Sequence, residues 1–147
     1  MTTETRALQV AVAIGSLVPL GAGLAGVLLG PALVGAGSSG LSDLDSHFRY
    51  LSGLLLAIGI GYLSTIPRIE TQGRRFRLLT FIVLVGGIAR LASLVAVGKP
   101  STAMILAFLM ELGVTPALAA WQWRVARRYQ AIEPAAPART PRAFPSS

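Results

Sequence analysis

The sequence contains no cysteine and only one histidine, His47. A disulfide framework and a thiolate metal site are therefore excluded, and one imidazole cannot form a histidine cluster, so we expect no metal site. Charged residues make up only 13% of the chain, about half the usual share of a soluble domain. Apolar residues make up 53% of the 147 residues, which excludes an ordinary water-soluble domain, a disordered chain and a coiled coil.

Lysine is also scarce: Lys99 is the only one, whereas arginine occurs twelve times. This bias, together with abundant alanine and glycine, is typical of GC-rich bacterial genomes. The formal net charge of +7 would favour nucleic-acid binding in a soluble protein. Here the charges separate long apolar runs and are not interleaved with aromatic residues, so we expect no nucleic-acid partner. No Gly-rich phosphate loop follows a strand pattern, and we expect no cofactor.

Four apolar runs dominate the sequence. The runs at 7–42 and 50–67 carry no charge, and those at 78–98 and 100–123 carry one charge each, Arg90 and Glu111. A bilayer core about 30 Å thick needs roughly 20 helical residues, so each run fits one span. We predict an all-α integral membrane protein, a four-transmembrane-helix bundle at 1–130 that is antiparallel and up-down-up-down. The predicted spans cover about 8–29, 46–65, 76–97 and 102–123.

Glycine and proline mark the ends of these spans. The first helix is expected to stop at Gly30-Pro31, and a loop rich in glycine and serine follows at 31–46. Ser42 has capping-box spacing and offers an earlier start for the second helix, which Pro67 ends. Gly73 is the expected turn of the basic connector, and residues 98–101 form a tight turn before the fourth helix.

A proline lies inside the fourth span, and a proline-rich tail follows that span. Pro116 lies inside the fourth span and is expected to kink it, as membrane helices tolerate. The tail at 131–147 has four prolines and no apolar periodicity, so we predict a disordered cytoplasmic tail.

A cleaved signal peptide is the alternative for the first run. That run is much longer than the apolar core of a signal peptide, which is usually about 7–15 residues, and its length therefore favours a membrane span.

The positive charges are distributed unequally between the two sides of the membrane. With four spans, one side holds only Arg49 and Lys99, whereas the other holds ten arginines. These ten are Arg6, Arg68, Arg74, Arg75, Arg77, Arg124, Arg127, Arg128, Arg139 and Arg142. Because short cytoplasmic loops carry the excess of Lys and Arg, we expect a multi-pass protein of the bacterial cytoplasmic (inner) membrane with both termini in the cytoplasm.

Arg90 and Glu111 are the two charges expected within the membrane. A charge at the bilayer centre costs about 2.5–3.5 kcal/mol, so two of them are rarely kept unless they pair or serve a function. Counted along a helix from the turn at 98–101, Arg90 lies about 12 Å and Glu111 about 15 Å below the outer surface. Because the two helices are joined by a tight turn, we predict that the side chains pair in the outer half of the bilayer.

Small residues recur at four-residue spacing and predict close helix contacts. On the third helix, Gly86, Gly87 and Ser93 share a face with Arg90. On the first two helices, the predicted seams consist of Ala22, Gly26 and Gly30, and of Gly53, Ala57 and Gly61. Packing alone explains such seams, so they indicate a compact bundle and no particular activity.

A second polar cluster opens the second helix. Asp45 and Arg49 are spaced as i and i+4, which predicts a surface ion pair. Alternatively, Arg49 leans inward towards Arg90 and Glu111, and the two arginines form a positive site open to the outer side. Asp45, His47 and Ser93 are possible accessory residues of that site, and His47 is otherwise an interfacial side chain.

Four stretches also form a recognisable set: LDSHFRYLSG at 44–53, IPRIE at 66–70, GGIARLAS at 86–93, and Glu111 with Pro116. Together they resemble a bacterial family of small four-helix integral membrane proteins, domain of unknown function 4345. The resemblance covers about 8–123 and leaves the tail outside. It implies the four-span architecture and highlights Arg49, Arg90 and Glu111, and it implies no activity for them.

Three classes of function fit these observations. The first is binding or transport of a small polar, anionic or lipid-like ligand at Arg90, Glu111 and Arg49. The second is a structural or accessory subunit, in which a homo-oligomer or another membrane protein is the partner and the ion pair serves only packing. The third is a membrane enzyme acting on a lipid or quinone, with Glu111 as acid–base group. No second acid–base group is expected at its depth, so no catalytic residue is assigned.

Overall fold

The computed structural model describes residues 2–35 and 42–132. All regular structure in these two ranges is helical, and four helical segments are long and apolar enough to cross a membrane. They are Thr3–Val34, Ser42–Arg68, Gly73–Val97 and Thr102–Ala131. The predicted all-helical fold with four spans is confirmed. The predicted disordered tail lies outside the described residues, except for Ala131 and Ile132, which are helical.

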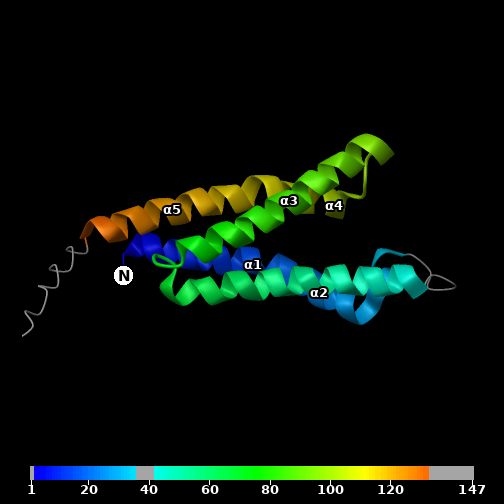
Figure 1. Ribbon diagram of the computed structural model, residues 1–147, viewed down its shortest axis with the longest axis horizontal. Helices are drawn as coiled ribbons and strands as arrows, with labels where there is room; N and C mark the ends of the chain where they lie inside the picture. Colours follow the sequence, from blue (N-terminus) through cyan, green and yellow to red (C-terminus); the bar gives the residue numbers. More distant parts are fainter. Residues whose placement is uncertain (1, 36–41, 133–147) are drawn as a thin grey trace, which may run out of the picture.

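Each span consists of one long helix or of helical pieces (Figure 1). The first three spans are α1 (Thr3–Leu29), α2 (Ser42–Thr65) and α3 (Gly73–Val97), with short 3₁₀ turns η1 (Gly30–Val34) and η2 (Ile66–Arg68) after the first two. The fourth span consists of α4 (Thr102–Leu109), the π-helical turn η3 (Met110–Val114) and α5 (Thr115–Ile132).

The first helix begins earlier than its apolar run. It starts at Thr3 instead of residue 8, because the Thr2 hydroxyl caps it by accepting a hydrogen bond from the Thr5 amide at 3.2 Å. It ends at Leu29, as predicted. The next residue, Gly30, has φ +60°, which disfavours any residue with a side chain. The caps therefore set both ends of the helix, while hydropathy shows only which part of it is apolar.

Two predicted boundaries near the arginines are wrong. Gly73 is the first residue of α3 and not the turn, which occupies the preceding residues 69–72. The last helix continues to Ile132, well past the predicted end at residue 123. Arginine, alanine and glutamine are good helix formers, so the helix continues after the apolar run stops.

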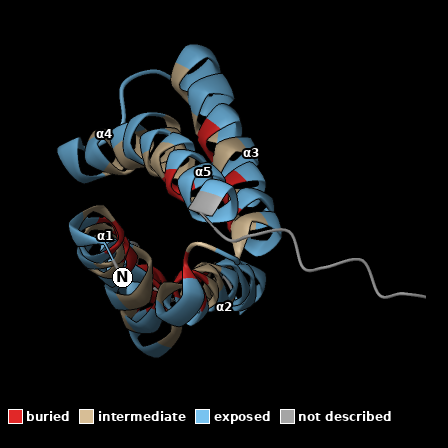
Figure 2. Ribbon diagram, turned by 90° about the vertical axis from the view of Figure 1, so that its left-hand side faces the viewer, coloured by how far each residue is buried: buried red, intermediate tan, exposed pale blue. Residues whose placement is uncertain are grey.

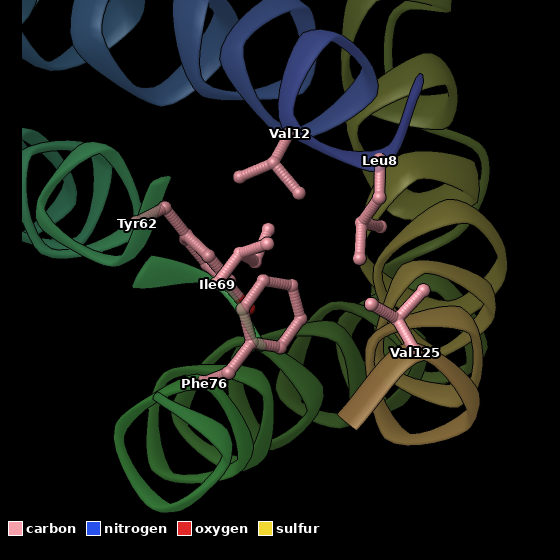
Figure 3. Packing of buried hydrophobic residues seen from close by; sticks show 6 residues of the cluster. All are labelled: Leu8, Val12, Tyr62, Ile69, Phe76 and Val125. Atoms are coloured by element: carbon pink, nitrogen blue, oxygen red, sulfur yellow. The ribbon is translucent and has the colours of Figure 1, made fainter. Parts of the chain in front are cut away.

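The buried core lies at one end of the molecule, which we call the core end. Here the start of α1, the end of α2, the start of α3 and the end of α5 meet (Figures 1 and 3). The edge of the Tyr62 ring packs on Phe76, with centroids 5.1 Å apart. The core consists of Leu8, Val12, Tyr62, Ile69, Phe76 and Val125.

Two glutamines tie the connector between α2 and α3 to the other helices. The Gln9 amide donates to the Ile66 carbonyl at 2.7 Å, and the Gln122 amide donates to the Ile69 carbonyl at 2.8 Å. Gln122 is almost fully buried, with 1% exposed. Backbone carbonyls that leave the helical pattern in a buried place need such donors. The four spans are therefore locked together at the core end.

The rest of the molecule, which we call the far half, is arranged as two separate pairs of helices (Figure 2). The helices α1 and α2 stay in contact, whereas α4 and η3 contact α3 and their own span. No residue in the described part of α1 or α2 lies beside α4 or η3. None of the most apolar window of the fourth span is buried.

Glycines bring α1 and α2 close together, although the predicted seams are only partly right. A Cβ on Gly23 would lie 2.5 Å from the Leu56 amide nitrogen, and one on Gly26 would overlap the Ser52 hydroxyl. Ala22 and Ala57 are exposed and face elsewhere. The strict four-residue spacing therefore misplaced part of the contact: Gly26 and Gly30 lie against α2, whereas Gly61 lies against Leu79 of α3.

Candidate functional site

The candidate site begins with a break in the fourth span. Pro116 has no amide hydrogen, and its ring would clash with the carbonyl four residues earlier in a regular α-helix. The chain widens into the π turn η3 just before this proline, so that the Thr115 amide bonds the Met110 carbonyl five residues back. The Thr115 hydroxyl donates to the same carbonyl at 2.9 Å. The predicted disturbance at Pro116 is therefore a π turn, and Glu111 lies within it.

Gly87 of α3 lets this turn come close. A Cβ at position 87 would lie 2.5 Å from Leu112 Cδ2 and 3.2 Å from Glu111 Cβ. Two consecutive residues of the π turn thus lie against the same glycine. At the neighbouring Gly86, an added Cβ would meet no atom within 4 Å. Only Gly87 is therefore required for the approach between α3 and the fourth span.

The predicted pairing of Arg90 with Glu111 is present. Arg90 Nε donates to Glu111 Oε1 at 3.0 Å and lies 2.9 Å from Oε2. The Glu111 side chain is 17% exposed and that of Arg90 is 37% exposed. The carboxylate is thus largely enclosed between the helices, whereas part of the guanidinium faces outward. A role for the pair beyond this contact stays a prediction.

The pair leaves two polar groups available. Glu111 binds the Nε side of the guanidinium, and Nη1 donates to the Met104 sulfur at 3.0 Å. Within the described ranges, Nη2 makes no hydrogen bond to the protein. Glu111 Oε2 is buried and lies 2.9 Å from Arg90 Nε, but it accepts no hydrogen bond there. The site thus offers outward-facing donors and one enclosed acceptor.

No other charge lies near this pair. Between residues 78 and 123, only Arg90, Lys99 and Glu111 are charged, and Lys99 lies in the turn between the third and fourth spans. Because an Arg and a Glu together carry no net charge, each offsets the cost of placing the other in the membrane, about 2.5–3.5 kcal/mol. The site is therefore neutral when it holds only its own side chains.

The inward position predicted as an alternative for Arg49 is wrong. Its Nε donates to Asp45 Oδ2 at 2.8 Å, and its Nη2 donates to Asp45 Oδ1 at 3.2 Å. Its Nη1 donates to the carbonyls of Val27 and Leu28, at 2.5 Å and 3.1 Å. Arg49 therefore closes the C-terminal end of α1, where orphan carbonyls need donors and favour a positive charge.

None of the accessory residues bonds to the pair within the described ranges. Asp45 is occupied by Arg49. His47 is exposed, and its ring lies tilted against Tyr50 with centroids 6.5 Å apart. Ser93 is exposed and makes no side-chain hydrogen bond within the described ranges. The structure thus brings Arg90 and Glu111 together, and a binding role for any of these residues stays a prediction.

Sequence reasoning missed three residues that make polar contacts, one beside the ion pair and two at the connector of the core end. Met104 supplies the sulfur beside Arg90, and a methionine in an apolar run gives no signal of this. The sequence did indicate Gln9 and Gln122. They are the only glutamines inside the first and fourth apolar runs, where a side-chain amide needs a hydrogen-bond partner.

The family model described as "Domain of unknown function (DUF4345)" matches residues 7–122. This chain belongs to that family. The matched range covers most of the chain and contains both Arg90 and Glu111. No curated protein and no solved structure matches the chain. Membership of the DUF4345 family assigns no chemistry to the chain.

The chemistry open to this DUF4345 chain follows from its donors and acceptors. In the described part of the chain, no group of three or more His, Asp and Glu side chains is placed to hold a metal ion. At the pair, a guanidinium that is partly exposed can bind an anion, and a carboxylate can exchange a proton. Neither group is a nucleophile placed next to a base, as a covalent mechanism would need.

Proposed function

We propose that this membrane protein binds a small anionic, lipid-like ligand at Arg90, beside Glu111. The Nη atoms of a guanidinium form a planar fork that matches two oxygens of a carboxylate or phosphate. In this chain Glu111 occupies the Nε side, so part of that fork stays available on the exposed face of the side chain. This free edge of Arg90 is the observation that carries the proposal.

The ligand is proposed to arrive from the far half. That half contains the turn between the third and fourth spans and is distant from the core end, which carries the predicted cytoplasmic arginines. We infer that the protein lies in a bacterial inner membrane with both termini in the cytoplasm, since positive charges gather on the cytoplasmic side. Arg90 then lies in the outer leaflet, within reach of an amphiphile whose acidic head is at the surface.

A binding experiment can test this function directly. The full chain is placed in phosphatidylcholine nanodiscs, and native mass spectrometry follows the binding of decyl phosphate and, separately, of inorganic phosphate. We expect one decyl phosphate per chain. Saturable binding of inorganic phosphate alone would instead indicate a free anion as the ligand, and binding of neither would refute the proposal.

Two matched variants locate the binding. Arg90→Met removes the fork and is expected to lower the affinity at least tenfold, about 1.4 kcal/mol, as expected for a lost charge-assisted contact. Lys99→Met removes a positive charge of the same sign from the nearby turn and is expected to bind like the unaltered chain. Equal losses in both variants would mean that only general surface charge attracts the anion.

A second candidate function is that of an accessory subunit. It is favoured by the fourth span, whose most apolar window is unburied whereas 22% of the corresponding window in each of the first two spans is buried. In that case Arg90→Met combined with Glu111→Leu would keep the fold and the association with a partner at fixed stoichiometry. Loss of ligand binding without loss of that partner would separate the two roles.

A further inference from the structure

The neutrality of the site has a consequence for any anion that binds there. Arg90 and Glu111 balance each other, and no further charged side chain lies between residues 78 and 123 except Lys99 in the turn. An anion added to the free edge of Arg90 would leave one uncompensated negative charge in an apolar setting. Such a charge is costly, so binding is favoured when a positive charge enters with the anion.

We propose that the anion binds together with one proton, which is taken up by Glu111. This inference rests on the proposed function and adds a coupling to it. One anion and one H⁺ leave the water. The anion is held by Arg90, the proton forms an O–H bond on the Glu111 carboxylate, and the site remains neutral. Release returns both to the water.

The surroundings of Glu111 favour a proton over a larger partner. Its Oε2 atom is buried, lies 2.9 Å from Arg90 Nε, and accepts no hydrogen bond within the described residues. An ammonium or hydroxyl group of a ligand cannot reach an atom that is already enclosed, whereas a proton occupies almost no volume. After protonation, Oε1 still accepts the hydrogen bond from Arg90 Nε, which is 3.0 Å long. The contact between α3 and η3 is therefore kept in both states.

The charged groups around Glu111 leave few alternative proton acceptors. The elements packed against η3 are α3, α4 and α5. On α3 the charged residue at this depth is Arg90, and α4 has no titratable side chain. The stretch of α5 next to η3 has none either, because its arginines begin at Arg124. His47 lies on α2, which does not contact η3.

The coupling has a defined sign. Because the bound state holds one proton more, the affinity for the anion rises as the pH falls, by up to about tenfold per pH unit. By reciprocity, the bound anion increases the affinity of Glu111 for the proton by the same factor. An anion bound without a proton would show an affinity that does not change with pH.

The test uses a probe that stays ionised. Decanesulfonate is titrated into the full chain in phosphatidylcholine nanodiscs from about pH 5 to about pH 9, a range in which a carboxylate inside a protein can titrate. In a weakly buffered solution, a pH indicator reports the protons taken up per anion bound. We expect the affinity to increase towards low pH and proton uptake to approach one per site.

Variants identify the group that takes up the proton. Glu111→Gln is expected to bind the anion with an affinity that is independent of pH and at least equal to that of the unaltered chain at low pH, without proton uptake. Lys99→Met is expected to keep the pH dependence. If Glu111→Gln does not fold, proton uptake by the unaltered chain still decides whether a proton is bound.

The possible failures are distinct. If the sulfonate binds with an affinity unchanged by pH and without proton uptake, the coupling is wrong and the proposed function stands. If Glu111→Gln keeps the pH dependence, the proton goes to another group and the inference is also wrong. If neither decanesulfonate nor decyl phosphate binds at any pH, the proposed function itself fails.

Discussion

The core end and the far half of this protein are held together by different interactions. At the core end, five apolar side chains from all four spans and one from the connector form the buried cluster, and two glutamines fix the connector. In the far half, the contact between α3 and the fourth span depends on Gly87 and on one ion pair. Close packing thus dominates one region, and a polar contact with little burial dominates the other.

This difference shows how the molecule separates stability from the candidate site. Inside a bilayer, apolar side chains gain little from meeting each other instead of lipid, so association depends on packing and on polar contacts. The core end supplies the packing. The far half can therefore keep an exposed guanidinium and a π turn, features that would weaken a region on which the fold depended.

The largest expected effect is a core substitution compared with a similar one in the far half. Phe76→Ala removes a fully buried ring and leaves a cavity, so we expect a loss of about 3 kcal/mol in the free energy of unfolding. Ile88→Ala, at an exposed position, is expected to cost less than about 0.5 kcal/mol. Unfolding in mixed detergent micelles measures both, and equal losses would contradict the division into two regions.

The second effect concerns the ion pair. Arg90→Met leaves the Glu111 carboxylate unpaired in the membrane, and we expect a loss of about 2–3 kcal/mol at neutral or higher pH. Adding Glu111→Leu should restore stability to within about 1 kcal/mol of the original chain. If the double variant is no more stable than the single one, the pair does not act as a unit.

The smallest effect compares two adjacent glycines. Gly87→Ala pushes its new Cβ against Leu112 and Glu111, and we expect a loss of about 1–2 kcal/mol. Gly86→Ala meets nothing within 4 Å, so it should be neutral or slightly stabilising, since alanine favours helix. Thermal unfolding in detergent distinguishes them. A similar loss at both positions would point to backbone effects and not to the close approach.

The sequence predicted the four spans well because apolar length is a direct physical requirement of the bilayer. It also predicted the contact between Arg90 and Glu111, because the tight turn at 98–101 places both at similar depth. Helix ends were less predictable. The ends of α1 and α5 depend on a threonine cap and on helix propensity, neither of which is visible in hydropathy.

The remaining errors arise from local competition. Arg49 was a candidate for the site, but Asp45 lies one helical turn away and the carbonyls of Val27 and Leu28 lie beside it, so nearby partners hold its guanidinium. Pro116 was expected to kink the helix, and nothing in the sequence indicated the π turn that precedes it and carries Glu111. A sequence pattern shows which groups need partners, and packing decides which partners they find.

The two glutamines also constrain how this protein is made. Gln9 can reach the Ile66 carbonyl once the first two spans are in place, but the Ile69 carbonyl finds its amide only when residue 122 has been synthesised. The connector joining the second and third spans therefore stays incomplete until the fourth span has been synthesised. Assembly of these four spans is in this respect completed by the fourth, whatever the order in which the earlier ones enter the bilayer.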